Sequence, residues 1–310
     1  MAEERTERPA FEIVCDSSCD LSPETCARLG VTLVSTRITL KDDEYLDRRI
    51  TREERERIFA AWGSVRVTAP GRDSYAAAFE DLVEDGATEI VVAAPSSKLS
   101  ESYSSAVAAA HEVPGARFKI IDTKCVSIKL AMVVARLAMD RDASLPVEEA
   151  VSNAAKVAEE SRLLMLLPPQ IAPEVAHLLG HARGLRKSIR SLSFRMSGDY
   201  IFTEIDQTGD VSILRRSTDV DWLAGILART MSVRAHEVGP LTTIELWTAK
   251  DDTLSRLEKP LVTNEFEARR AATVRARLST EAVLGTGTVG VAFIQQSLLD
   301  PYRLKCMLTD

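Results

Sequence analysis

Apolar and polar positions alternate with two different periods along the first half of the chain, which predicts strands separated by helices. Short apolar or alternating runs predict strands at residues 11–16, 31–40, 64–68, 89–95 and 118–122. The segments between and after them repeat their apolar residues with helical spacing, at residues 22–30, 51–62, 71–86, about 102–112 and 127–140. This order predicts an α/β fold in which a parallel sheet carries helices on both faces.

Local start and stop signals support two of these helices. Ser22 precedes Pro23 at the first expected helical position, and Gly30 follows the last one. Thr51 and Glu54 have the spacing of a capping box at the start of the next helix.

The pattern changes after about residue 145. Residues 146–162 predict a linking helix, residues 200–206 and 211–216 a hairpin, and residues 218–236 a long amphipathic helix. Further strands are expected at 163–168, 241–249 and 273–279, with a helix at 173–184 and a glycine-containing segment at 284–296. We therefore expect two domains, residues 1–160 with the parallel sheet and residues 161–310 with a mixed α/β sheet.

Charge and hydropathy narrow the classes of partner. The net charge is −7 and the basic residues are spread along the chain, so a nucleic-acid partner is not expected. No apolar run reaches the roughly 20 residues that a membrane helix needs, and the first ten residues lack the apolar segment of a signal peptide. The expectation is a cytoplasmic protein without stable membrane insertion.

The five cysteines are interpreted as free thiols. Cys15, Cys19, Cys26, Cys125 and Cys306 form no CxxC pair and have no matching histidine or cysteine cluster downstream. Buried free thiols are therefore favoured over a metal or redox site, and no metal is expected.

Short hydroxyl and carboxylate side chains gather at the expected strand ends. These residues are Asp16, Ser17, Ser18, Thr68, Ser96, Ser97, Ser100, Asp122 and Thr123. Each alone is explained as a helix cap, but parallel strands bring their carboxyl ends to one edge, where ligands bind. Hydroxyls and free backbone N–H groups suit an anion. Because no glycine-rich phosphate loop is present, a single carboxylate fits better than a phosphate.

The same residues carry a resemblance to a known family. "IVCDSSCDLSPE", "PSSKLSESYSSA" and "IIDTKCVS", which includes Ser127, resemble segments of DegV-family proteins in order and spacing. The resemblance implies a two-domain protein that buries a long-chain fatty acid between its domains. It also implies a carrier without catalytic residues or a cofactor, from which some members present the acid to a separate fatty acid kinase subunit.

Position by position, the resemblance makes Thr68 and Ser100 the first candidates for carboxylate contact. Ser97 is a third candidate, although its position also suits loop shaping. Asp16, Ser17, Ser96 and Asp122 are expected to shape the loops, as are Gly285 and Gly287 in "VLGTGTVG", where the family's histidine is missing. In "RGLRK", Gly184 and Arg186 remain of a Gly-Gly-Arg segment, and Arg186 is a candidate partner contact.

Glu101 stands where the family has glycine, beside the expected carboxylate site. It either faces that site, where a second carboxylate makes binding depend on pH, or is a solvent-facing charge in the first turn of a helix.

Two other functions stay open. A clustered serine could act as the nucleophile of a hydrolase, but the chain has four histidines, with none at recognisable triad spacing, and no GxSxG motif. The altered second half could also leave a DegV-like module that docks a partner without a ligand. For the carrier, an apolar tunnel is expected from the aliphatic residues of 90–95, 163–168 and 289–294.

Overall fold

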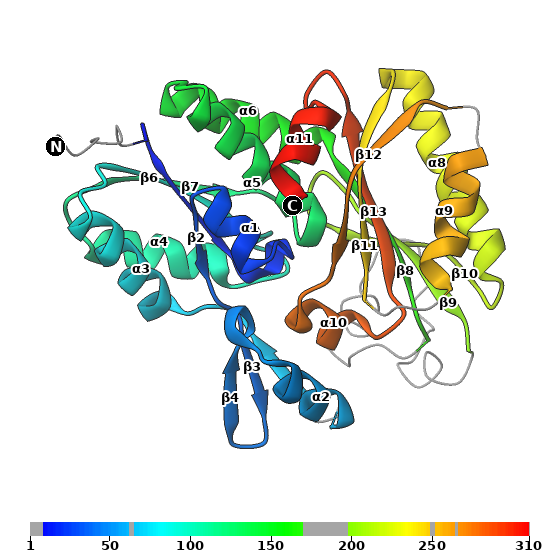
Figure 1. Ribbon diagram of the computed structural model, residues 1–310, viewed down its shortest axis with the longest axis horizontal. Helices are drawn as coiled ribbons and strands as arrows, with labels where there is room; N and C mark the ends of the chain where they lie inside the picture. The colour runs from blue at the N-terminus through cyan, green and yellow to red at the C-terminus, as the bar shows by residue number, and fades with distance from the viewer. Residues whose placement is uncertain (1–8, 62–64, 170–197, 249–251, 264–265, 310) are drawn as a thin grey trace, which may run out of the picture.

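The computed structural model describes residues 9–61, 65–169, 198–248, 252–263 and 266–309. Its first part contains a four-stranded sheet in which every strand pair is parallel. The strand order is β2 (Val31–Val34), β1 (Glu12–Asp16), β6 (Glu89–Ala94) and β7 (Arg117–Asp122). All four carboxyl ends therefore lie at one edge of this sheet (Figure 1).

Helices cover both faces of the parallel sheet, as predicted. Alternate side chains of β1 enter different cores, because successive residues of a strand point to opposite faces. Ile13 and Cys15 pack with α1 (Pro23–Arg28), α5 (Ser127–Asp142) and α6 (Val147–Glu160). Val14 packs with Tyr75 and Phe79 of α3 (Arg72–Glu84) and with the alanines of α4 (Ser102–Glu112).

The caps predicted for two helices are confirmed. The Ser22 side chain accepts the Thr25 N–H at the start of α1, where Pro23 takes the first position. Thr51 and Glu54 form both hydrogen bonds of a capping box at the start of α2 (Arg52–Ala60).

Residues 31–40 do not form one strand, which corrects the sequence interpretation. Beyond β2 the chain turns at Ser35 and Thr36, where the Thr36 N–H donates to Ser17 Oγ at 2.9 Å. It then enters a separate antiparallel sheet of β4 (Asp43–Leu46), β3 (Arg37–Leu40) and β5 (Val65–Thr68). This small sheet and α2 project from the main body (Figure 1). The run at residues 64–68 is therefore a strand, but not one of the parallel sheet.

The second part of the chain builds a mixed six-stranded sheet. Its order is β10 (Val211–Ser217), β9 (Tyr200–Ile205), β8 (Arg162–Leu167), β13 (Val289–Gln295), β11 (Leu241–Trp247) and β12 (Ala268–Arg275). Among the strands that the structure describes in this sheet, only β11 and β12 pair in parallel, and β9 with β10 is the predicted hairpin. The strand predicted at 273–279 is wrong at its end, because Leu278 and Ser279 already belong to α10 (Leu278–Leu284).

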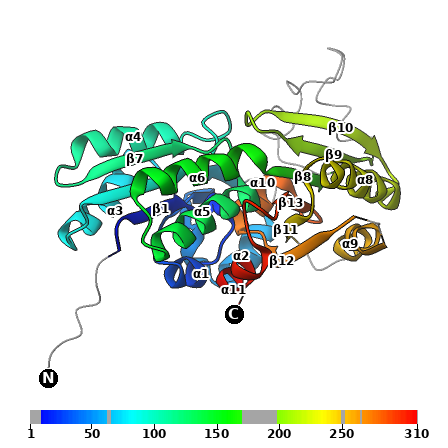
Figure 2. The same ribbon diagram turned by 90° about the horizontal axis from the view of Figure 1, so that it is seen from above.

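The six-stranded sheet is also covered on both faces. α8 (Val220–Val238) and α9 (Thr253–Thr263) pack on the face that carries Leu164 and Leu166. Leu163 and Met165, which alternate with them along β8, join the core of α5 and α6, and Figure 2 shows these two helices between the two sheets. The chain ends with α11 (Pro301–Leu308).

Three further sequence predictions concern the segment around Arg186, the cysteines and a membrane helix. The helix expected at 173–184, with Gly184, and the partner contact Arg186 lie outside the described residues. Four of the cysteines are free and buried, whereas Cys306 is free and exposed. Within the described ranges, no helix combines the length and apolar character needed to cross a membrane.

Candidate functional site

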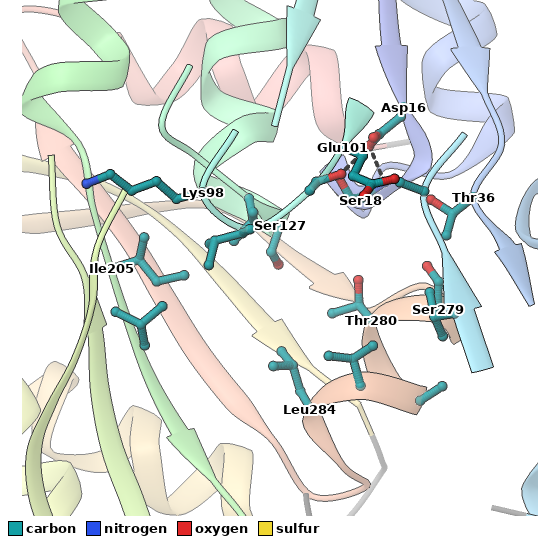
Figure 3. A pocket seen from close by; sticks show the side chains of 18 of the residues that line it. Asp16, Ser18, Thr36, Lys98, Glu101, Ser127, Ile205, Ser279, Thr280 and Leu284 are labelled. Atoms are coloured by element: carbon teal, nitrogen blue, oxygen red, sulfur yellow. Dashed lines mark hydrogen bonds between the residues drawn. The ribbon is translucent and has the colours of Figure 1, made fainter. Parts of the chain in front are cut away.

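A cavity of about 720 Å³ lies where the edge of the parallel sheet meets the small antiparallel sheet, α10 and strands β8–β10. Figure 3 shows Asp16, Ser18 and Thr36 on one side of it and Ile205 on the opposite side. Aliphatic side chains line most of it, namely Val65, Val67, Leu99, Val126, Met165, Leu167, Ile205, Val211, Val283 and Leu284. The site is therefore an apolar chamber with one polar wall.

Asp16, the last residue of β1, anchors the polar wall. Its Oδ1 accepts the backbone N–H of Ser18 at 2.9 Å and the Ser18 hydroxyl, and its Oδ2 accepts the hydroxyl of Ser102. Burial raises the pKa of Asp16 to about 6, and the bonds from Ser102 and Ser18 only partly oppose that rise. Asp16 thus joins the turn at Ser18 to the start of α4, and it also lines the cavity.

The loop between β6 and α4, residues 95–101 and called the serine loop below, supplies Ser96, Ser97 and Ser100. Ser96 is buried, and its carbonyl accepts the backbone N–H groups of Leu99 and Ser100 at 2.9 and 3.0 Å, so that it closes the loop as a turn. Ser100 lines the cavity and donates its hydroxyl to Ser102 Oγ at 3.0 Å.

Ser97 lies at the cavity but has its hydroxyl directed elsewhere. Its Oγ donates to Asp122, and its backbone N–H reaches the same carboxylate at 3.1 Å. Burial alone raises the pKa of Asp122, but the bonds from Lys124 and Ser97 outweigh it, and the net shift is downward. The single hydroxyl proton of Ser97 is thus committed to a charged acceptor, which fits loop shaping better than ligand contact.

Thr68 reaches the cavity from an unexpected element. It ends β5 in the antiparallel sheet, where it pairs with Arg37, and it is exposed. Thr68 borders the cavity and also a second hollow that Arg37, Thr39 and Arg66 line. Among the described residues, neither Thr68 nor its cavity neighbour Thr36 forms a hydrogen bond through its side chain. These two hydroxyls can therefore donate to a ligand.

A second polar cluster was largely missed by sequence reasoning. Ser127, Ser279 and Thr280 also line the cavity (Figure 3). Ser127 donates to Asp20 at 2.5 Å, and Ser279 Oγ donates to Asp47 at 2.8 Å. The link between Ser279 and Asp47 spans 232 residues, so only Ser127, in the third motif, had a local signal.

The DegV family model, described as an uncharacterised protein of the DegV family, matches residues 10–168, about half of the chain. This stretch contains every strand of the parallel sheet, the serine loop and β8. The chain belongs to the DegV family.

Solved structures of DegV-family proteins share the fold over nearly the whole chain. A DegV-family protein from Thermus thermophilus, described with fatty acid binding, has a TM-score of 0.77 and 20% identity, covering 92% of this chain and 99% of its own. A stearic-acid-binding protein from Eubacterium ventriosum has a TM-score of 0.77 and 20% identity, with 92% and 98% covered. A DegV-family protein from Eubacterium eligens, loaded with heptadecanoic acid, has a TM-score of 0.73 and 16% identity, with 92% and 99% covered. Among curated proteins, none matches this chain.

The glycines that carried the DegV resemblance lie just behind the cavity wall. Gly285 ends α10 at φ 96°, one residue after the cavity-lining Leu284, and Gly287 has φ 94°. The Gly287 N–H donates to Thr248 Oγ1 at 2.8 Å. Ser17 stands between the cavity-lining Asp16 and Ser18, and its Oγ accepts the Thr36 N–H at 2.9 Å. These contacts give all three residues roles in the backbone around the cavity.

The apolar wall of this DegV-family member has a different origin from the one expected. Met165 and Leu167, from the predicted segment 163–168, line the cavity. The segments 90–95 and 289–294 do not line it, since their side chains are committed to helix-covered cores. Their place is taken by residues of β5, β9, β10 and α10.

A polar contact links the two walls. Lys98 of the serine loop pairs with Asp210 of the β9–β10 turn at 2.7 Å. In the same turn Gly209 has φ 78°, and a Cβ there would lie 2.5 Å from Ser96 Oγ. The turn is thus seated directly on the serine loop.

The described residues show no catalytic constellation around the serines. His111 and His236 are the two histidines of the described ranges, and neither lines the cavity. No group of three metal-ligating side chains occurs in those ranges either.

Proposed function

We propose that this chain binds a long-chain fatty acid in the cavity, with the acyl chain along the aliphatic wall and the carboxylate at the hydroxyl wall. The observation that carries the proposal is the cavity itself, an apolar chamber of about 720 Å³ with donors on one side. That volume lies in the usual range for small-ligand sites. The fatty acids described for the related DegV-family structures support the same ligand class.

The energetics favour an amphipathic acid. Each buried methylene contributes about 0.8 kcal/mol, so a long chain gains most of its affinity from the aliphatic wall. Neutral hydroxyls hold a carboxylate without the cost of burying a second charge. We propose Thr68 and Ser100 as the direct carboxylate contacts, because both line the cavity and Thr68 has a free donor.

We also propose that the chain is a carrier which presents the acid to a separate kinase subunit. Thr68, Ser97 and Glu101 line the cavity and are all exposed, so the proposed carboxylate end is close to the surface. Residues 1–160 and 161–310 are the two domains in this proposal, with the ligand held where they meet.

Native mass spectrometry of the protein purified from cells tests the ligand. The expected result is an added mass that lipid extraction identifies as a fatty acid. A ligand-free mass, together with no response to a fluorescent fatty acid, would refute the proposal. The carrier role needs a second assay, in which ATP is consumed only when a candidate kinase, this chain and a fatty acid are all present.

A further inference from the structure

A chain of hydroxyl groups connects the cavity to a buried carboxylate. Ser100, which lines the cavity, donates to Ser102 Oγ at 3.0 Å, and Ser102 donates to Asp16 Oδ2. The Ser102 backbone N–H returns a bond to Ser100 Oγ at 3.2 Å. The hydroxyl donors in this chain therefore point away from the cavity and toward Asp16.

This direction conflicts with binding a carboxylate at Ser100. A hydroxyl has one proton, and that of Ser100 is already directed to Ser102. Toward the cavity, Ser100 Oγ can therefore only accept a hydrogen bond. A ligand carboxylate can also only accept, so the two oxygens cannot bond to each other. Ser100 can donate to the ligand only if Ser102 donates to Ser100 instead, which leaves Asp16 Oδ2 without its donor.

We propose that Asp16 takes up one proton when a fatty acid binds, and that the chain Asp16–Ser102–Ser100 then reverses its direction. The protonated Asp16 Oδ2 donates to Ser102, Ser102 donates to Ser100, and Ser100 donates to the ligand carboxylate. The proton comes from solvent, and no covalent bond between heavy atoms changes. Asp16 is thus a positioning residue that acts through two serines. This inference rests on the proposed fatty-acid function.

The other bonds of Asp16 are compatible with the reversal. Ser18 holds Oδ1 with both its backbone N–H and its hydroxyl, so the proton is placed on Oδ2, the oxygen that faces Ser102. One proton replaces one lost donor, and each hydroxyl still donates one bond, while Ser100 Oγ accepts from both the hydroxyl and the backbone N–H of Ser102. Without that proton, two carboxylates would share a partly buried site, which disfavours their joint ionisation.

Asp20 is a second buried carboxyl that accepts a hydroxyl of the cavity lining, that of Ser127, and burial raises its pKa to about 7. Asp16 is the carboxyl at the end of the chain that leads to Ser100. In the described part of the chain no ion pair includes Asp16, and burial already raises its pKa to about 6. Burial also raises the pKa values of Cys15, on the same strand, and of Tyr75, on α3, well above their ordinary values, so both remain neutral. Hydrogen bonds with Cys15 and with Cys26 lower the pKa of Cys19, which lies two residues beyond Ser17. Glu101, just before Ser102, is exposed.

Titration of oleic acid between about pH 5.5 and 8.5 tests the inference, with Asp16→Asn as the central variant. The wild-type affinity should fall by up to about tenfold per pH unit above pH about 6, because one proton is taken up on binding. In Asp16→Asn the new side-chain amide donates to Ser102 at every pH, so the profile of this variant should be flat. Asp122→Asn is the matched control at the neighbouring strand end and should keep the wild-type slope, since its lowered pKa leaves Asp122 ionised throughout.

Calorimetry in two buffers of different ionisation enthalpy measures the proton directly. At pH about 7.5 we expect uptake of about one proton per oleic acid by the wild type and none by Asp16→Asn. If Asp16→Asn fails to fold, Ser102→Ala breaks the chain at its centre and should reduce the uptake well below that of the wild type.

The outcomes separate this inference from the proposed function. Failure of the wild type to bind oleic acid at any pH would refute the function. Tight binding with a flat pH profile and no proton uptake would leave the function standing and refute the inference. Equal slopes for wild type and Asp16→Asn, or a carboxyl-labelled oleic acid whose NMR shift shows it bound in the protonated form at pH about 7.5, would refute the inference as well.

Discussion

The two walls of the cavity are built by different principles. On the hydroxyl wall, the serines are held by specific bonds, as with Ser97 on Asp122 and Ser100 on Ser102, whereas, among the described residues, Thr36 and Thr68 are not. On the aliphatic wall, Met165, Leu167, Ile205 and Val211 come from three strands of the six-stranded sheet and contact a ligand only through shape. In the proposed function, the first wall determines where the carboxylate sits, and the second determines how much of the acyl chain is buried.

This contrast predicts that changes to the aliphatic wall alter affinity through volume, whereas changes to the hydroxyl wall alter it through individual bonds. A hydrogen bond to a charged group is worth about 1.5–3 kcal/mol, while each methylene contributes about 0.8 kcal/mol. A substitution that excludes several methylenes from the cavity should therefore reduce affinity more than a substitution that removes one hydroxyl.

The largest effect is expected from Val283→Trp, which places an indole in the chamber. Val283 is half-buried at the end of α10, so the substitution fills ligand space rather than a closed core. Excluding about four methylenes costs about 3 kcal/mol, which is about a hundredfold in affinity for a long-chain acid.

Fluorescence displacement with a long-chain and a medium-chain acid measures this effect. The medium-chain acid should lose much less affinity, and the matched control Val283→Ala should bind both acids nearly as the wild type does. Equal losses for both acids would show that Val283 does not border the acyl chain.

Next in size are Thr68→Val and Ser100→Ala on the hydroxyl wall. Each should weaken binding about ten- to a hundredfold, because each removes one hydrogen bond to a charged group. The losses should be similar for acids of all lengths, since the bond is to the carboxylate. Fluorescent fatty-acid titration checks this, with thermal unfolding to show that the fold is retained. If both variants bind as tightly as the wild type, the carboxylate lies elsewhere.

The same contrast explains what the sequence could predict. The hydroxyl wall was largely predictable because its residues follow strands in short local motifs, and the caps at Ser22 and Thr51 are local as well. The aliphatic wall was not, because an apolar residue in a strand does not reveal whether it faces a helix or a cavity. Thus residues 90–95 were wrongly placed at the tunnel, while Val65 and Val283 were missed.

Long-range contacts account for the other errors. The polar residues Ser35, Thr36 and Arg37 interrupt the alternation within residues 31–40, but the bond between Thr36 and the distant Ser17 is what separates β2 from β3. Likewise "TVRARLS" alternates like a strand, but Ser279 is held by Asp47 at the start of α10. In both places a hydrogen bond to a distant residue overrides the local pattern.

A smaller effect is expected at the contact between the walls. Gly209→Ala adds a Cβ 2.5 Å from Ser96 Oγ at a residue with φ 78°, so the β9–β10 turn must move away from the serine loop. We expect a loss of stability of about 1–3 kcal/mol. Gly239→Ala is the matched control, since its φ is 86° but no atom lies within 4 Å of the added Cβ. Chemical unfolding of both variants measures the difference, and equal losses would mean that backbone strain alone, and not the contact between the walls, is responsible.

The smallest effect is expected from Glu101→Gln, which tests whether the hydroxyl wall responds to pH through a buried or an exposed carboxylate. Glu101 is exposed, stands at the start of α4 and lines the cavity. It is not a member of the hydrogen-bonded chain Ser100–Ser102–Asp16. A charge at an exposed helix start is worth about 0.3–1 kcal/mol, so removing it should change the fatty-acid affinity by less than about fivefold. Because Ser102 bonds to Asp16 and not to Glu101, the pH profile of Glu101→Gln should follow that of the wild type between about pH 5.5 and 8.5. If Glu101→Gln instead gave the flat profile expected for Asp16→Asn, the proton-linked group would lie at the exposed start of α4 rather than at the buried end of β1.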